Sequence, residues 1–147
     1  MKNRAAYPFA IAVTLLCLNA PTWAQSGKAV QSGEQVYQQV CVACHATGVA
    51  NAPKLGDKVA WKPLIEEGQP TLTGHAWVGV RAMPAQGGAT RLSLEEFARA
   101  VAWMASQSGG SWRDPDAATL KAIREQAREQ LKKDLSRKQK LLADPGR

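Results

Sequence analysis

The sequence has no apolar run long enough to span a membrane and no segment in which apolar and polar residues alternate as in a β-strand. It also has no internal repeat. A length of 147 residues is too short for a TIM barrel or a two-domain dehydrogenase, and a hydrophobic content of 45% is too high for a wholly disordered chain. These absences leave one small globular domain with appendages.

Acidic residues are too few to balance the basic ones. Lys and Arg number 19 against 12 Asp and Glu, a net charge of +7 that would suit a nucleic-acid-binding protein. The excess is uneven, because residues 25–110 have seven basic and six acidic side chains, whereas residues 111–147 have ten and six. A nearly neutral domain lacks the field that binding to a phosphate backbone requires, so nucleic acid is not an expected partner.

Residues 1–24 have the pattern of a secretory signal peptide. Lys2 and Arg4 precede an uncharged, apolar run of about ten residues, and small residues follow at Thr22 and Ala24, after which cleavage is expected. A bilayer-spanning helix needs about 18 apolar residues, so retention as a membrane anchor is the less favoured alternative. The pattern predicts a periplasmic protein of bacterial type, with no integral membrane segment after processing.

Helix signals recur through residues 25–110, which we take as one domain. Ser32 with Gln35 and Ser93 with Glu96 have the form of capping boxes, each followed by an apolar stripe. Shorter helices are expected over 61–67, with Pro63 in the first turn, and over 72–80. Gly and Pro residues predict loops over 46–57 and 83–90. The fold class predicted is therefore all-α.

Residues 111–147 are predicted to form a separate, charged helical tail. Asp114-Pro115 would cap and begin this helix. One thin apolar stripe runs along it, and Glu129 to Lys133 and Asp134 to Lys138 have the spacing of favourable ion pairs. The stripe consists of Leu120, Ile123, Ala127, Leu131 and Leu135. A solvated tail and a docking segment for a larger complex are both compatible with this pattern.

Cys41-Val42-Ala43-Cys44-His45 is a haem attachment sequence. Thiols three residues apart on a helix have Cβ atoms about 5–6 Å apart, so both can reach vinyl groups of one porphyrin. His45 follows directly and can offer a neutral imidazole nitrogen to the iron. The sequence therefore predicts one covalently attached haem c.

Two other uses of these cysteines are less favoured. A thioredoxin-like site needs a βαβ setting that this chain lacks. A zinc site would need a fourth ligand, for which His75 is the only other histidine, and zinc-finger spacing is absent.

The second axial ligand to the iron must come from another part of the chain. Met83 is the strongest candidate, because it lies in a Pro- and Gly-containing loop rather than on an apolar helical stripe. Met104 shares its helix face with Phe97 and Val101, which favours a core role. His75 would give a bis-histidine haem, but its ordinary helical position favours a surface or packing role.

The order of motifs across residues 28–108 resembles that of the class I cytochromes c, most closely the small bacterial cytochrome c-five type. The motifs are Gly33-x-x-Val36-Tyr37, Cys41-x-x-Cys44-His45, Ala52-Pro53-Lys54-Leu55-Gly56-Asp57, Trp61, Met83-Pro84 with Gly87-Gly88, and Leu92-Ser93. The resemblance implies that the first and last helices of the domain cross and pack around the haem, with His45 and Met83 as axial ligands. Core packing is the default interpretation of Trp61, and the resemblance also suggests it as a neighbour of a haem propionate through its indole N–H. Many members of this type have a further cysteine pair, which residues 86–91 lack.

These features predict a monomeric electron carrier rather than an enzyme, since iron bound on both sides has no position open for oxygen or peroxide. A haem enzyme or gas sensor in which Met83 is unbound is one alternative, and a haem subunit docked through residues 120–142 is another. Redox partners with acidic surfaces are expected to bind near the haem motifs, and ordinary solubilising side chains are the alternative interpretation of the basic residues there. The basic residues that flank these motifs are Lys54, Lys58, Lys62 and Arg81.

Overall fold

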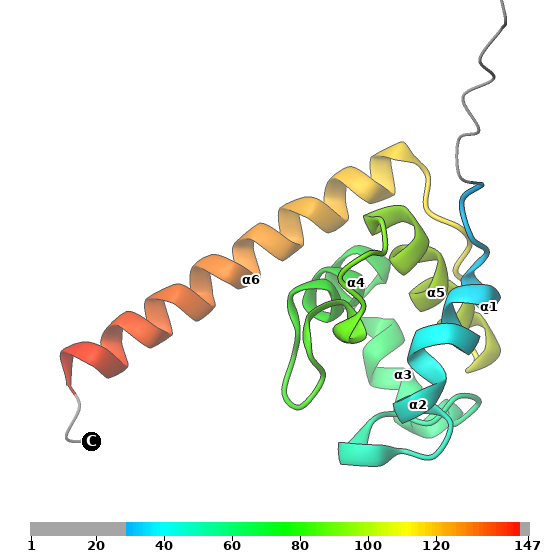
Figure 1. Cartoon of the computed structure of the whole chain (residues 1–147), viewed down its shortest axis with the longest axis horizontal. Helices are drawn as coiled ribbons and strands as arrows, with labels where there is room; N and C mark the ends of the chain where they lie inside the picture. The colour runs from blue at the N-terminus through cyan, green and yellow to red at the C-terminus, as the bar shows by residue number, and fades with distance from the viewer. Residues whose placement is uncertain (1–28, 145–147) are drawn as a thin grey trace, which may run out of the picture.

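The computed structural model describes residues 29–144, and the predicted signal peptide lies outside them. Within this range the chain is all-helical, as predicted, with one isolated bridge between Val80 and Met83. Figure 1 shows the arrangement. In chain order the helices are α1 (Gly33–Val36), the π-helix η1 (Tyr37–Cys41), α2 (Val42–His45), η2 (Val49–Asn51), α3 (Lys58–Glu66), α4 (Gln69–Val78), η3 (Ala85–Gly88), α5 (Leu94–Gln107) and α6 (Ala117–Ala143).

Both predicted capping boxes are present. The Ser32 hydroxyl accepts a hydrogen bond from the Gln35 amide at 3.2 Å, and the Gln35 side chain accepts one from the Ser32 amide at 2.9 Å. Ser93 and Glu96 make the same reciprocal pair at 3.1 and 2.9 Å. Each box satisfies amides that a helix start would otherwise leave unpaired. The boxes therefore begin the two long helical segments of the domain.

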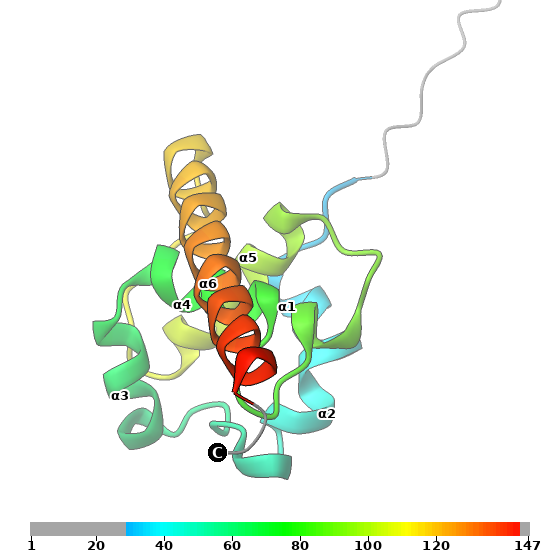
Figure 2. The ribbon, with the colours of Figure 1, turned by 90° about the vertical axis from the view of Figure 1, so that its left-hand side faces the viewer.

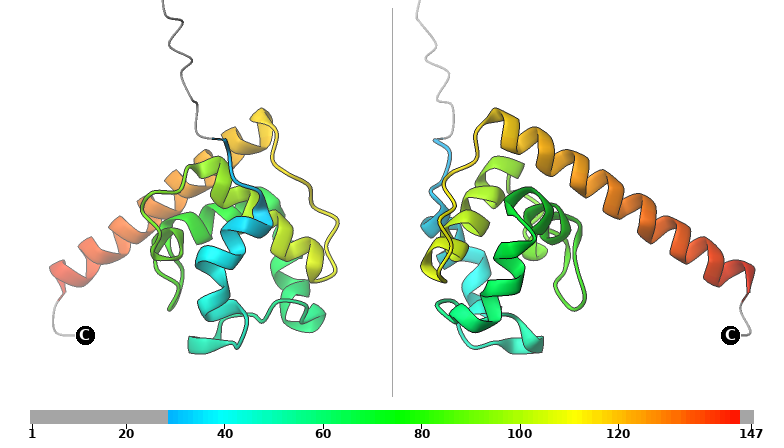
Figure 3. Two further views of the ribbon diagram at one scale, coloured as in Figure 1. Left: turned by 45° about the vertical axis from the view of Figure 1, so that its right-hand side comes forward. Right: turned by 180° about the vertical axis from the view of Figure 1, so that it is seen from behind.

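Helix α1 crosses α5 at a point of close contact. A Cβ atom on Gly33 would lie 2.3 Å from the carbonyl oxygen of Arg99, so only glycine allows this approach. One turn on, the rings of Tyr37 and Trp103 stack with centroids 4.9 Å apart. The first and last helices of the domain thus cross as expected, and Figure 3 shows this crossing on the side of the molecule away from the end of α6.

The core lies between α5, the N-terminal helical segment and α3–α4. Met104 is 3% exposed within it, which confirms the prediction of a core methionine. Trp77 and Phe97 pack edge to face with centroids 5.4 Å apart. The buried cluster comprises Val36, Tyr37, Cys41, Trp61, Ala76, Phe97, Ala100, Val101, Met104 and Ala105.

Helices α3 and α4 each begin three residues earlier than predicted. The Asp57 side chain caps α3 by accepting hydrogen bonds from Val59 and Ala60, so Pro63 lies in the helix interior and not in its first turn. Helix α4 begins at Gln69, after Gly68 has reversed the chain at φ +88°. The predicted start of α3 was too late because its cap, Asp57, lies several residues before the apolar stripe. The predicted start of α4 was too late because the first turn of this helix accommodates Pro70.

Helix α6 begins two residues later than predicted and is not an isolated tail. Its cap is Asp116, whose carboxylate accepts from the Thr119 amide at 2.7 Å, whereas Asp114 lies 3.7 Å from Arg99. The predicted ion pairs between residues four apart are wrong, because Glu129 and Asp134 each pair with a basic residue three positions later instead. These pairs are Glu129–Lys132 at 2.7 Å and Asp134–Arg137 at 3.3 Å.

The first half of α6 packs across α4 (Figure 2). Ile123 and Ala127 are 0% and 5% exposed, and a Cβ atom on Gly74 of α4 would lie 2.8 Å from the Cβ atom of Gln126. Gly74 is unfavourable for a helix by propensity, yet it provides the contact surface for α6. The second half of α6 extends past the domain (Figure 1). No helix among residues 29–144 is both long and apolar enough to cross a bilayer.

Candidate haem-binding site

The two predicted attachment cysteines lie at the end of the N-terminal helical segment in different environments. Cys41 ends the π-helical turn η1, is 7% exposed and belongs to the core cluster, whereas Cys44 is exposed in α2. Burial raises the pKa of the Cys41 thiol to about 11, with negative charge on Cys44 adding to the increase. One thiol is therefore protonated at neutral pH and surrounded by apolar side chains, while the other faces solvent.

His45 is held in the orientation and tautomer that a metal ligand needs. Its side chain is buried, and its ring Nδ1 lies 2.8 Å from the carbonyl oxygen of Pro53. A carbonyl can only accept, so Nδ1 has a proton, and in the neutral ring Nε2 then keeps a lone pair. This is the outer hydrogen bond that metal-bound imidazoles usually make. His45 therefore fits the role of an iron ligand that binds through Nε2.

The loop that supplies the Pro53 carbonyl is tied down on both sides. The Leu55 amide donates to the His45 carbonyl at 2.8 Å, and the Gly56 amide donates to the Ser108 hydroxyl at 3.0 Å. The indole N–H of Trp61 donates to the Lys54 carbonyl at 2.8 Å. The indole donor of Trp61 therefore holds this loop in place. Sequence analysis missed these roles, because each depends on a contact made through the fold.

Met83 closes a tight turn after α4. Its amide donates to the Val80 carbonyl at 2.9 Å, and its carbonyl accepts from the Val80 amide at 3.1 Å. Arg81 has φ +54° within the turn, and a Cβ atom on Gly79 would lie 2.9 Å from the Ala85 amide nitrogen. The half-buried Met83 side chain packs against the core cluster. The loop is therefore held in shape without a disulfide.

The structure brings Cys41, His45 and Met83 to one apolar core, whereas Cys44 is exposed. Cys41 belongs to the buried cluster, and Met83 packs against it. The His45 ring lies 6.2 Å from that of Trp61, which belongs to the same cluster. The Met83 loop also contacts η1, since a Cβ atom on Gly87 would lie 3.3 Å from Val40.

Partly buried apolar side chains surround this core and suit an apolar macrocycle. They are Val40, Val42, Leu55, Leu64, Ile65, Leu72, Trp77, Met83, Leu92, Trp103 and Trp112. The surroundings and the histidine tautomer together fit a haem.

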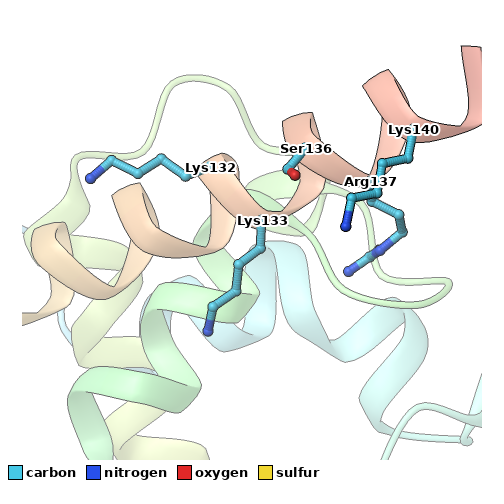
Figure 4. A pocket seen from close by; sticks show the side chains of 5 residues that line it. All are labelled: Lys132, Lys133, Ser136, Arg137 and Lys140. Carbon is cyan, nitrogen blue, oxygen red and sulfur yellow. The ribbon is translucent and has the colours of Figure 1, made fainter. Parts of the chain in front are cut away.

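The zinc alternative finds no support in residues 29–144, where no three His, Cys, Asp or Glu side chains are grouped as metal ligands. The Nδ1 atom of His75 instead lies 3.4 Å from a carboxylate oxygen of Glu67. A surface hollow lies on the other part of the molecule, between side chains of α6 alone (Figure 4). It is lined by Lys132, Lys133, Ser136, Arg137 and Lys140, and by none of the predicted site residues.

Comparisons with known proteins cover the part of the chain that holds this site. The model of the family described as cytochrome C oxidase, cbb3-type, subunit III matches residues 28–104. Cytochrome c-555 of Chlorobaculum tepidum is 41% identical over 81 residues, which cover 52% of this chain and 75% of that protein. Cytochrome c5 of Azotobacter vinelandii is 38% identical over 80 residues, with 53% and 96% covered. The chain is a class I cytochrome c.

A solved relative of this cytochrome agrees in fold. The crystal structure of an electron transfer complex of nitrite reductase with cytochrome c contains a chain that is 45% identical, with a TM-score of 0.50. The match covers 52% of the present chain and 93% of that chain. The cytochrome is a small electron carrier and not an enzyme. Helix α6 lies beyond the residues that the family model matches.

Proposed function

We propose that this cytochrome is a periplasmic single-haem carrier that passes single electrons between respiratory redox proteins. The haem would be attached through Cys41 and Cys44, and its iron would be bound by His45 and Met83. The observation that carries the proposal is the 2.8 Å contact from His45 Nδ1 to the Pro53 carbonyl, because it leaves Nε2 available as a ligand. Export rests on the signal pattern of residues 1–24.

The proposed ligands set the chemistry of the site. The haem supplies a reversible one-electron iron couple. His45 and Met83 would occupy both axial positions, which leaves no position for oxygen or peroxide. The Met83 thioether favours ferrous iron, and the apolar side chains around it disfavour the additional charge of the ferric state, so a positive reduction potential is expected. The capped and packed backbone around both ligands would keep the geometry similar in the two oxidation states.

Exposed basic residues are the proposed docking surface for partners. Lys54, Lys58, Lys62 and Arg81 are all exposed, and none forms a salt bridge within residues 29–144. Unpaired surface lysines would steer a partner with an acidic surface. Since a 45% identical cytochrome forms a complex with nitrite reductase, a nitrite reductase is the first partner to assay.

A role as a haem subunit, docked through α6 onto a larger complex, is the second candidate. The exposed Leu131, Leu135 and Leu142 favour it. Ile123 and Ala127 are buried against the chain's own α4, so this part of the predicted stripe has no surface left for a partner. Docking could therefore involve only the distal half of the helix. Native mass with and without residues 117–144 tests it, and a monomer in both cases would contradict it.

Substitution of the two methionines tests the proposed ligation. Wild-type oxidised protein should show the weak near-infrared sulfur-to-iron band, and its ferrous form should not bind carbon monoxide at neutral pH. Met83→Leu should remove the band and open the iron to carbon monoxide while covalent haem, measured as the pyridine haemochrome, stays unchanged. Met104→Leu is the matched control, because Met104 is a core side chain, and should keep the band.

Two results would contradict the proposal. Survival of the band in Met83→Leu would remove Met83 as a ligand. A rapid carbon monoxide or peroxide reaction of the wild-type protein would favour a site open at the iron, as in a haem enzyme or gas sensor.

A further inference from the structure

Helix α6 has an exposed face that begins in its first half and continues along its distal half, where the domain does not cover it. Residues that follow one another at steps of four and three lie on one face of an α-helix. Leu131, Leu135 and Leu142 on this face are 54%, 58% and 81% exposed, which is unusual for leucine. We call this surface the α6 face, and it consists of Arg124, Arg128, Leu131, Leu135, Lys138 and Leu142, all exposed.

Packing of α6 on the domain leaves this face free. Ile123 and Ala127 hold the helix against α4. Ile123 lies roughly a quarter turn around the helix from the α6 face, and Ala127 lies at the edge of the face, one turn before Leu131. The second half of the helix extends past the domain (Figures 1 and 3). The face is therefore open along the whole distal half of the helix.

The α6 face is basic as well as apolar. It has three basic side chains and no carboxylate. Glu129 lies on the other side of the helix, where it pairs with Lys132 at 2.7 Å. Asp134 lies beside the face and is engaged by Arg137 at 3.3 Å and Gln130 at 3.2 Å. An occupant of this face must accept leucine side chains and neutralise positive charge.

Charge and composition select among possible occupants. A second copy of α6 would bring like charges together at Arg128 and Lys138. A protein interface usually has aromatic residues at its centre and few lysines, yet this face has no aromatic residue and Lys138 lies between Leu135 and Leu142. Leucines bordered by lysine and arginine are typical of helices that lie in the headgroup region of an anionic bilayer. Lysine suits the middle of such a face because its methylenes can lie among lipids while its ammonium reaches phosphate.

We propose that the distal half of α6 binds the surface of anionic phospholipid membranes through this face. The leucines would enter the boundary between headgroups and acyl chains, and the basic side chains would bind headgroup phosphates. Such binding is reversible and weakens with salt. It would hold the carrier at a membrane surface without a spanning segment.

Sedimentation of full-length haem-loaded protein with vesicles tests the proposal. Vesicles of phosphatidylcholine with phosphatidylglycerol should bind the protein at low ionic strength, and vesicles of phosphatidylcholine alone should not. The double variant Leu135→Gln and Leu142→Gln changes no charge and should weaken binding by about tenfold or more. Both leucines are exposed, so the haem spectrum and thermal unfolding should be unchanged.

A charge-matched pair of variants separates this face from general electrostatic attraction. Arg128→Gln with Lys138→Gln should also weaken binding about tenfold. Lys133→Gln with Lys140→Gln removes the same charge from the opposite side of the helix, where both side chains are exposed, and should weaken it by less than about threefold.

Several outcomes would overturn the proposal. One is wild-type protein that stays in the supernatant with anionic vesicles, and another is equal weakening by the two charge pairs. A dimer in analytical ultracentrifugation that the leucine variant dissociates would assign the face to a second copy. A leucine variant that binds vesicles normally but transfers electrons more slowly to a nitrite reductase would assign it to a protein partner. None of these results would alter the axial ligation test, which is read from the haem spectrum.

Discussion

Single atoms at two residues decide how the haem-binding segment is held. Gly33 has no Cβ atom, and one placed there would lie 2.3 Å from the Arg99 carbonyl and 2.8 Å from the Trp103 side chain. His45 donates through Nδ1 to Pro53, which orients its ring. The first determines how closely α1 approaches α5, and the second determines which ring nitrogen can bind a metal.

Replacement of Gly33 by alanine should destabilise the protein. The added methyl group would push α1 away from backbone atoms of α5, which cannot move as a side-chain end can. Overpacking of this kind costs about 1–3 kcal/mol in the free energy of unfolding. Denaturant unfolding of the haem-loaded protein measures this cost. Glu34→Ala, at an exposed position in the same turn, is the control and should change the free energy by less than about 0.5 kcal/mol.

At the scale of helices, side-chain caps decide where each element begins. The caps on α1 and α5 are the serines of the two predicted capping boxes. The cap on α6 is Asp116, two residues beyond the one predicted. Hydrogen bonds, chiefly from the Thr119 amide, lower the pKa of the Asp116 carboxyl below its ordinary value. This cap therefore depends on ionisation.

The start of α6 should weaken in acid. A carboxyl group with a lowered pKa in the folded state contributes stability above its unfolded-state pKa, and the contribution is lost as pH falls through the folded-state value. Asp116→Asn keeps a good cap at every pH, whereas Asp116→Ala lacks one throughout. Hydrogen exchange of the first-turn amides should show wild-type protection equal to the asparagine variant at neutral pH and lower than it in strong acid. Equal protection of all three proteins at neutral pH would contradict the capping role.

At the scale of the whole molecule, α6 has two parts with different roles. Its first half covers α4, where Gly74 allows close approach, and its second half extends past the domain. The domain matched by the known relatives ends before this helix. The cytochrome core therefore has an additional structural layer that the resemblance does not explain.

Removal of the Ile123 side chain should destabilise the cytochrome, although this residue lies outside the matched domain. Ile123 is 0% exposed, and Ile→Ala at a buried site costs about 2–5 kcal/mol. Leu135→Ala removes a similar side chain that is 58% exposed and should cost less than about 0.5 kcal/mol. Thermal unfolding followed at the haem absorption band checks both values. Equal effects of the two substitutions would mean that α6 does not pack on α4.

Local patterns in the sequence determined the haem attachment sequence, the all-α class and the starts of α1 and α5. A capping box joins residues three apart, and an apolar stripe repeats every three or four residues, so both can be identified before any tertiary contact is known. The position of Met104 in the core could be predicted for the same reason. Met83 was predicted as a ligand from its loop setting, and that assignment remains a proposal.

Only the tertiary structure decided which distant groups meet. The Pro53 carbonyl reaches His45 because a loop folds back, and Ser108 holds that loop from the far end of α5. The indole of Trp61 donates to a backbone carbonyl that no pattern identifies. Gly74 weakens a helix by propensity, yet it is what allows α6 to pack at Gln126. Close packing depends on the shapes of both surfaces, and a sequence pattern describes only one of them.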